Sequence, residues 1–248
     1  MPDPVAIPPE LVERLRSAKS VAVLTGAGIS AESGVPTFRD ALTGHWARFN
    51  PEELATPEAF RKNPRQVWSW YADRRASLEG VEPNPGHFAL AEIESRIPRF
   101  TLATQNVDGL HQRAGNRNVL ELHGNITRTK CSTEGRIVPA WPVSDEIPPR
   151  CPHCRAFLRP DIVWFGEELP WDKLAAARDA ALGCDLFLAV GTSAVVLPAA
   201  GLVDEALSAN ACVVEINPNP TPYTGRVSFA FAQPSGVFLP ALVRAAFP

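Results

Sequence analysis

The sequence predicts an α/β fold: an open parallel sheet with helices on both faces, joined to a small lobe built from inserted segments. Three observations support this. Short runs of β-branched and large apolar residues are typical of strands buried in a parallel sheet, and each run ends in small or amide-bearing residues. Around these runs, apolar residues recur at helical spacing. A segment rich in cysteine and turn residues, 128–157, interrupts the pattern and indicates a ribbon-like insertion.

The first buried strand is predicted at Val21–Leu24, and a glycine turn and a helix start follow it. The spacing Gly26-x-Gly28-x-x-Ala31 fits the pattern in which glycines let the backbone approach a dinucleotide pyrophosphate at a helix N-terminus. This favours a Rossmann-like sheet, although a tight turn without a ligand would show the same spacing. In dehydrogenases of this type, a second strand about 20 positions later ends in an acidic residue that binds the ribose. No such strand is evident in this sequence.

Helices are predicted on both sides of this strand, over 8–18 and from the cap-and-proline pairs Asn50-Pro51 and Asn63-Pro64. The helix over 64–79 has one face made of Val67, Trp70, Tyr71, Arg74 and Leu78. Arginine is rarely buried without a partner, so two interpretations remain open. Arg74 could form an ion pair beside a core tyrosine, or the guanidinium and the phenol could together bind an anionic ligand such as a carboxylate.

The remaining elements alternate between strands and helices. Asn84-Pro85-Gly86-His87 predicts a turn that begins a helix through Ile93, which makes His87 a helix-start residue. Leu120 and Leu122 alternate with Glu121 and His123, so His123 should face away from the leucine side. Strands are expected at 100–104, 119–123, 185–190, 211–216 and 227–232, and a closing helix at 239–247.

Polar or small residues follow four of the predicted strands. These strand ends are Gly26-Ala27-Gly28, Gln105-Asn106-Val107-Asp108, Gly191-Thr192-Ser193 and Asn217-Pro218-Asn219. Open parallel sheets bind ligands along the edge where the carboxyl ends of their strands lie. Four such ends together favour a nucleotide-binding crevice.

Five stretches carry a resemblance to a known family: GAGISAESGVPTFR, TQNVDGLHQRAG, ELHGN, GTSAVVLPAA and the Ile-Asn-Pro segment at 216–218. In this order and at these separations they resemble the signatures of the sirtuins, which are NAD-dependent protein-lysine deacylases. The resemblance extends from about Leu15 to Leu242. Thr37, where many members have Asp, is the form found in the class III branch.

The resemblance implies a reaction and a set of site residues. In the family, the acyl oxygen of a modified lysine attacks C1′ of the nicotinamide ribose, and the products are free lysine, nicotinamide and an O-acyl-ADP-ribose. His123 would act as general base on a ribose hydroxyl, and Asn106 and Asp108 would line the nicotinamide end. The residues implied to bind NAD are Gly26, Ala27, Gly28, Ser30, Phe38, Arg39, Trp46, Gln105, Asn106, Val107, Asp108, Gly191, Thr192, Ser193, Asn217, Pro218, Asn219 and Ser235.

The same resemblance implies a substrate: acylated lysine side chains of proteins. Tyr71-x-x-Arg74 is the pair that binds the distal carboxylate of succinyl- or malonyl-lysine in the class III branch, and Ala59 resembles the small residue that widens the acyl pocket there. Val163, Trp164, Phe165 and Gly166 resemble the segment that pairs with the substrate peptide as an added strand. We therefore expect removal of succinyl and malonyl groups and of acetyl groups as well.

The ribbon departs from the family pattern at one position. A structural zinc site needs two cysteine pairs, and Cys131, Cys151 and Cys154 occupy three of the four places. Glu134 stands at the fourth. Two interpretations remain open: zinc held by three thiolates and a carboxylate, or a ribbon held by packing alone. Cys184 and Cys212 lie in apolar strands and are expected to be inert core residues.

Composition limits the other functions. A net charge of −3 gives no reason to expect nucleic-acid binding, and no apolar run of about 18 residues predicts a membrane span. We expect a cytoplasmic monomer with one catalytic domain over 1–248. Its large lobe would comprise 1–38, 84–127 and 158–248, and its small lobe 39–83 and the ribbon 128–157. The alternatives are a dehydrogenase and an NAD-binding or ADP-ribose-binding module without catalysis.

Overall fold

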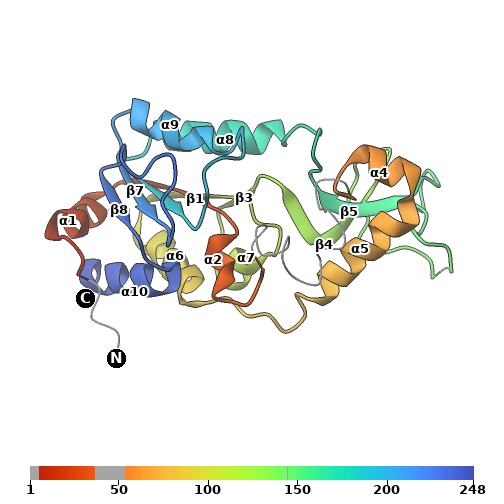
Figure 1. Ribbon diagram of the computed structural model, residues 1–248, viewed down its shortest axis with the longest axis horizontal. Helices are drawn as coiled ribbons and strands as arrows, with labels where there is room; N and C mark the ends of the chain where they lie inside the picture. Colours follow the sequence, from red (N-terminus) through yellow and green to blue (C-terminus); the bar gives the residue numbers. More distant parts are fainter. Residues whose placement is uncertain (1–5, 37–53, 144) are drawn as a thin grey trace.

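The computed structural model describes residues 6–36, 54–143 and 145–248, and its centre is a six-stranded sheet (Figure 1). The strand order is β3-β2-β1-β6-β7-β8, and every neighbouring pair is parallel, which confirms the predicted sheet. The strand order reverses between β1 and β6, and ligands of open parallel sheets bind at the carboxyl ends of strands at such a switch point. The strands are β1 (Ser20–Thr25), β2 (Arg99–Thr104), β3 (Val119–Glu121), β6 (Leu186–Val190), β7 (Cys212–Ile216) and β8 (Phe229–Phe231).

Helices cover both faces of the sheet, as predicted (Figure 1). Val21 and Val23 of β1 pack into the hydrophobic cluster on one face, whereas Ala22 and Leu24 pack into the cluster on the other. This alternation is the period of two expected of a strand with both faces buried. The first face is covered by α1 (Pro9–Ser17), α6 (Pro85–Arg96) and α10 (Ser235–Ala246), and the second by α8 (Trp171–Leu182) and α9 (Gly201–Ser208).

Several helices differ from the sequence prediction, α8, α9 and α10 among them. The patterns did not reveal α8 and α9, because α8 in particular buries alanines, which give little contrast with its polar positions. The closing helix α10 begins at Ser235, four residues before the predicted Leu239. Its first turn is capped from elsewhere in the chain, since the Glu32 carboxylate accepts hydrogen bonds from Gly236 N (2.7 Å) and Ser235 Oγ (3.3 Å).

A smaller unit lies at the end of the molecule opposite α1 and α10 (Figure 1). It contains α4 (Pro57–Lys62), α5 (Pro64–Ala76) and an antiparallel pair, β4 (Gly124–Cys131) and β5 (Leu158–Ile162). α5 ends at Ala76 and not near Glu79. The paired strands reach beyond the predicted ribbon 128–157 on both sides. Side chains from both insertions form one buried cluster, which includes Phe60, Val67, Trp70, Tyr71, Ile126, Ile162 and Trp164.

Two short helices complete the edge of the sheet. α2 (Gly28–Ala31) follows the end of β1, and α7 (Leu110–Arg113) follows the loop after β2. The predicted helix start at Asn50-Pro51 lies outside the described residues. Within the described ranges, no helix is long and apolar enough to cross a membrane.

Candidate active site

The carboxyl ends of β1 and β6 lie in direct contact. Gly26 N donates to Val190 O (3.1 Å), and Gly28 N donates to Gly191 O (2.8 Å). A Cβ atom added at Gly28 would lie 2.7 Å from Gly191 O, and Gly191 itself has φ of +57°. Side chains at these positions would push the two strand ends apart. The predicted glycine loop is therefore also a packing element, which keeps the β6 end beside the β1 end.

The loop after β2 meets α2 through a buried hydroxyl. Ser30 Oγ donates to Asp108 Oδ2 (2.8 Å) and accepts from Asn106 Nδ2 (3.0 Å). Leu110 N donates to the other oxygen of Asp108 (2.9 Å). Burial raises the pKa of the Asp108 carboxyl, and these hydrogen bonds oppose that shift. Three residues predicted to contact NAD thus lie together and hold one another in fixed orientations.

His123 lies at the same edge, in the turn that follows β3. Its Nδ1 is 2.9 Å from the carbonyl oxygen of Gln105, so Nδ1 carries the proton and Nε2 keeps its lone pair. Burial lowers the pKa of the imidazole, and the Gln105 carbonyl opposes this. The ring is therefore neutral near pH 7, the form that a general base requires. Leu122 is fully buried and lies in the same hydrophobic cluster as Leu120, in agreement with the predicted alternation.

Thr192 links this histidine loop to the last two strand ends. Gln105 Nε2 donates to Thr192 Oγ1 (2.9 Å), and Asn217 Nδ2 donates to Thr192 O (3.1 Å). The ends of β2, β6 and β7 are thereby joined by side chains that the sequence analysis assigned to one site. Ser193 is half-buried nearby in sequence, and Pro218 and Asn219 are exposed beyond β7.

The Tyr71 and Arg74 side chains leave α5 on its inner side. Tyr71 is buried, and burial raises the pKa of its phenol to about 12. The Arg74 guanidinium lies 4.9 Å from the centroid of the Trp70 ring, and burial lowers its pKa while Tyr71 opposes the shift. Within the described ranges, no carboxylate forms an ion pair with Arg74. The ion-pair interpretation therefore has no support there, and the half-buried Ala59 packs against the same cluster.

The segment 163–166 contacts both His123 and the Tyr71 side chain. Val163 N donates to His123 O (2.9 Å), and Phe165 N donates to Ala55 O (2.9 Å). Trp164 is buried, Phe165 is 47% exposed, and Gly166 has φ of +85°, a conformation that favours glycine. The segment predicted to pair with a peptide thus has its backbone anchored to His123 at one end.

Four further residues were predicted to bind the cofactor: Phe38, Arg39, Trp46 and Ser235. Phe38, Arg39 and Trp46 fall outside the described residues. Ser235 is buried at the start of α10, where its hydroxyl contacts Glu32. No local sequence signal pointed to Glu32, because it caps a helix that is distant in the chain.

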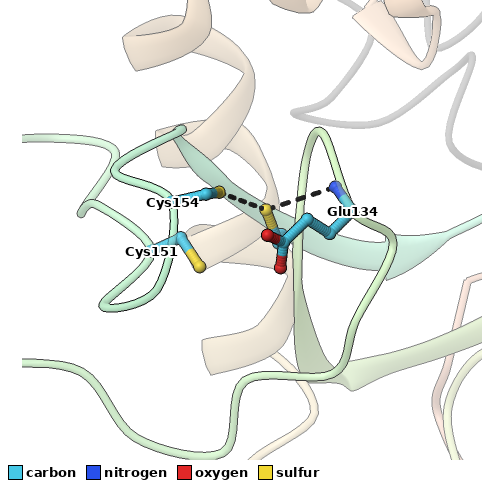
Figure 2. A group of neighbouring side chains, drawn as sticks. Glu134, Cys151 and Cys154 are labelled. Atoms are coloured by element: carbon cyan, nitrogen blue, oxygen red, sulfur yellow. Dashed lines mark hydrogen bonds between the residues drawn. The ribbon is translucent and has the colours of Figure 1, made fainter.

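A group of possible metal ligands lies in the ribbon and consists of Cys131, Glu134, Cys151 and Cys154 (Figure 2). The ligand atoms of all four lie within 4.8 Å of one another. Cys131 Sγ is 3.3 Å from Cys154 Sγ and accepts a hydrogen bond from Glu134 N (3.4 Å). Figure 2 shows the Glu134 carboxylate turned toward the sulfur atoms. Three thiols and a carboxylate are a donor set that zinc accepts, so this cluster could hold a structural metal ion.

Comparison with known proteins identifies the family. The sequence model of the Sir2 family matches residues 26–198. The chain belongs to the Sir2 family. It is 50% identical over 238 residues to a protein of Ralstonia nicotianae named NAD-dependent protein deacylase, and the match covers 96% of each chain. It is 49% identical to NAD-dependent protein deacylase 1 of Pseudomonas aeruginosa, over 96% of this chain and 98% of the relative. The resemblance to sirtuins is confirmed.

Solved structures of sirtuins have the same fold. A Sir2 homologue in complex with NAD is 41% identical, with a TM-score of 0.90 and coverage of 98% of this chain and 95% of the other. A second Sir2 structure, with a deacetylated peptide and 3′-O-acetyl ADP ribose, is 29% identical, with a TM-score of 0.85 and coverage of 95% and 96%. Membership in this family removes the dehydrogenase alternative.

One contact in the sirtuin's site escaped the sequence analysis. His87 does lie in the first turn of α6, where its Nδ1 accepts from Asn84 N (3.3 Å) in a capping box. Its Nε2, however, lies 3.4 Å from Ser30 Oγ, next to the Asp108 contact. Burial lowers the pKa of His87 to about 4, so the ring is neutral there. A helix-start signal explained the residue locally, and nothing in the sequence indicated a second contact.

The ribbon cluster gives a testable prediction about metal content. We expect purified wild-type protein to contain about one zinc per chain, because three thiolates supply most of the binding free energy. Glu134→Cys should release zinc to a chelator more slowly than wild type, since a fourth soft ligand replaces a carboxylate. Zinc content and release are measured by elemental analysis and a chromogenic chelator. Cys212→Ala, in the core, is the matched control, and less than about 0.2 zinc per wild-type chain would contradict the prediction.

Proposed function

We propose that this sirtuin removes acyl groups from lysine side chains of proteins with consumption of NAD. We further propose that it prefers the acidic acyl groups succinyl and malonyl and also removes acetyl. The observation that carries the proposal is the pairing of two features. His123 is held as a neutral base by Gln105, and the segment anchored to its carbonyl leads to Tyr71 and to an arginine without a carboxylate partner in the described residues.

NAD is proposed to lie along the carboxyl ends of β1, β2, β6 and β7. The glycines that follow β1 and β6 have no side chains at this edge of the sheet, so a pyrophosphate could approach the backbone closely. Ser30, Asn106 and Asp108 supply one hydrogen-bonded group for the nicotinamide end, and Thr192 and Asn217 supply another toward the adenosine ribose. The names of the relatives and the NAD complex of a structural neighbour support NAD as the co-substrate.

His123 is proposed to take a proton from a ribose hydroxyl. The Gln105 carbonyl fixes the tautomer, so Nε2 is the atom that receives the proton. The lowered pKa keeps that atom free of a proton at neutral pH. Nicotinamide and an O-acyl-ADP-ribose are the proposed products; a neighbouring structure with 3′-O-acetyl ADP ribose and a deacetylated peptide supports this.

The peptide is proposed to add as a strand to 163–166, and the distal carboxylate of the acyl group to meet Tyr71 and Arg74. A guanidinium and a phenol in a partly buried pocket bind a carboxylate strongly, whereas an acetyl group offers them no charge. Ala59, which packs against the same cluster, is proposed to leave room for the acyl chain. We also propose the two-lobed division given above, with a monomeric protein that acts in the cytoplasm.

Mass spectrometry of one peptide, carrying succinyl-lysine or acetyl-lysine and incubated with and without NAD, tests the proposal. We expect loss of the acyl mass only with NAD, formation of matching O-acyl-ADP-ribose, and faster turnover of the succinyl peptide. Turnover of the acetyl peptide alone would contradict the acyl preference and leave the deacylase reaction. Binding of NAD without turnover of either peptide would favour the non-catalytic module.

A further inference from the structure

A buried hydrogen bond joins the proposed peptide segment to the proposed acyl pocket. Trp164 Nε1 donates to Tyr71 OH at 3.0 Å, across two parts of the chain that are 93 residues apart. An indole nitrogen can only donate, so the phenol oxygen must accept. The single hydrogen of the Tyr71 hydroxyl then remains available for donation to another acceptor. None of the described residues supplies one.

The Trp164 indole is held in place from several sides. The Arg159 guanidinium lies 3.2 Å from the centroid of the ring, and Arg159 forms a double ion pair with Glu167 (2.6 and 2.9 Å). Glu167 also accepts a hydrogen bond from Trp164 N (2.9 Å). Phe60 packs on the indole with a centroid distance of 5.2 Å. The direction of the Trp164 N–H is therefore fixed before any ligand binds.

We propose that Trp164 is a positioning residue for acyl-group selection, because its N–H commits the Tyr71 hydroxyl to act as a hydrogen donor toward a carboxylate. This inference rests on the proposed preference for acidic acyl groups. A phenol that accepts one hydrogen bond donates its own hydrogen more strongly. An anionic acyl group, which only accepts hydrogen bonds, gains from a hydroxyl held in this state. An acetyl group carries no distal carboxylate and gains nothing from this state.

Trp164→Phe tests the inference, since phenylalanine keeps an aromatic ring and removes the N–H. We expect kcat/KM for the succinyl peptide to fall about two- to tenfold, mainly through KM, as for loss of one hydrogen bond to bound substrate. The ratio of the succinyl value to the acetyl value should fall by a similar factor, because any effect of the ring on peptide binding is common to both peptides. Trp171→Phe is the matched control, because Trp171 is 73% exposed at the start of α8, and it should alter neither value.

A double-mutant cycle with Tyr71→Phe shows whether Trp164 acts through the phenol. In the Tyr71→Phe background, Trp164→Phe should cause no further loss with the succinyl peptide. Multiplicative losses, or equal losses with both peptides, would overturn the inference. If Trp164→Phe does not fold, 3-benzothienylalanine at position 164 keeps the bicyclic shape without the N–H and gives the same comparison. Wild-type protein that does not remove succinyl at all would instead refute the acyl preference, and this inference with it.

Discussion

Replacing His123 by alanine should reduce deacylation of both succinyl and acetyl peptides by about two to four powers of ten, the usual contribution of a general base. The Gln105 carbonyl, 2.9 Å from Nδ1, fixes the tautomer of the His123 imidazole. Its Nε2 is therefore the nitrogen that is left to accept a proton. The loss should appear in kcat, because the proton transfer occurs in the reaction and not in peptide binding. Formation of O-acyl-ADP-ribose, followed by mass spectrometry, is the readout.

His123→Asn separates the chemistry from the packing. The asparagine Nδ2 can donate to the Gln105 carbonyl much as the imidazole Nδ1 does, but it offers no basic nitrogen. We therefore expect a folded protein with unchanged NAD binding and a loss as large as that of the alanine variant. Activity of either variant within a few-fold of wild type would show that another group is the base.

Arg74→Met should reduce desuccinylation by about one to three powers of ten and leave deacetylation unchanged. A hydrogen bond to a charged group contributes about 1.5–3 kcal/mol, and the carboxylate of the substrate would in addition be buried without a counter-charge. Methionine keeps much of the length and the apolar stem, although the cation–π contact of the guanidinium with Trp70 is lost. Steady-state kinetics with one peptide in its two acylated forms gives the ratio directly.

Arg65→Met is the matched control for this variant, because Arg65 lies exposed on the same helix. It should not change the ratio of the two activities. Arg74→Lys should recover only part of the desuccinylase activity, since an ammonium lacks the planar, bidentate geometry of the guanidinium. Equal loss of desuccinylation and deacetylation in Arg74→Met would place Arg74 in a structural role and refute the pocket assignment.

Much of the fold followed from local patterns. The apolar runs that became β1, β2, β6 and β7 are short, continuous and bounded by polar residues, which is the pattern of strands covered on both faces. The cap-and-proline pair at Asn63-Pro64 marked the start of α5 correctly, because the cap contact is made within four residues. Where a signal depends on neighbours in the sequence, the sequence was sufficient.

Helix limits were predicted poorly where packing determines them. The start of α10 depends on Glu32, which lies more than 200 residues away in the chain and reaches Gly236 only in the folded protein. The alanine-rich α8 is helical against the sheet, where Ala177 and Ala181 are buried, although its pattern is weak. Tertiary contacts of this kind stabilise a helix by an amount that the intrinsic helix propensities of its residues do not include.

By itself, the sequence determined which residues could form the site, because strand ends of a parallel sheet meet at one edge wherever the intervening chain goes. It could not decide which of the open interpretations holds at Arg74 or Glu134. Those depend on which groups come within hydrogen-bonding or coordination distance, a few ångströms, and such distances are set by the packing of segments far apart in the chain. The folded structure brings Glu134 to the three cysteines, leaves Arg74 without a carboxylate in the described residues, and joins Trp164 to Tyr71.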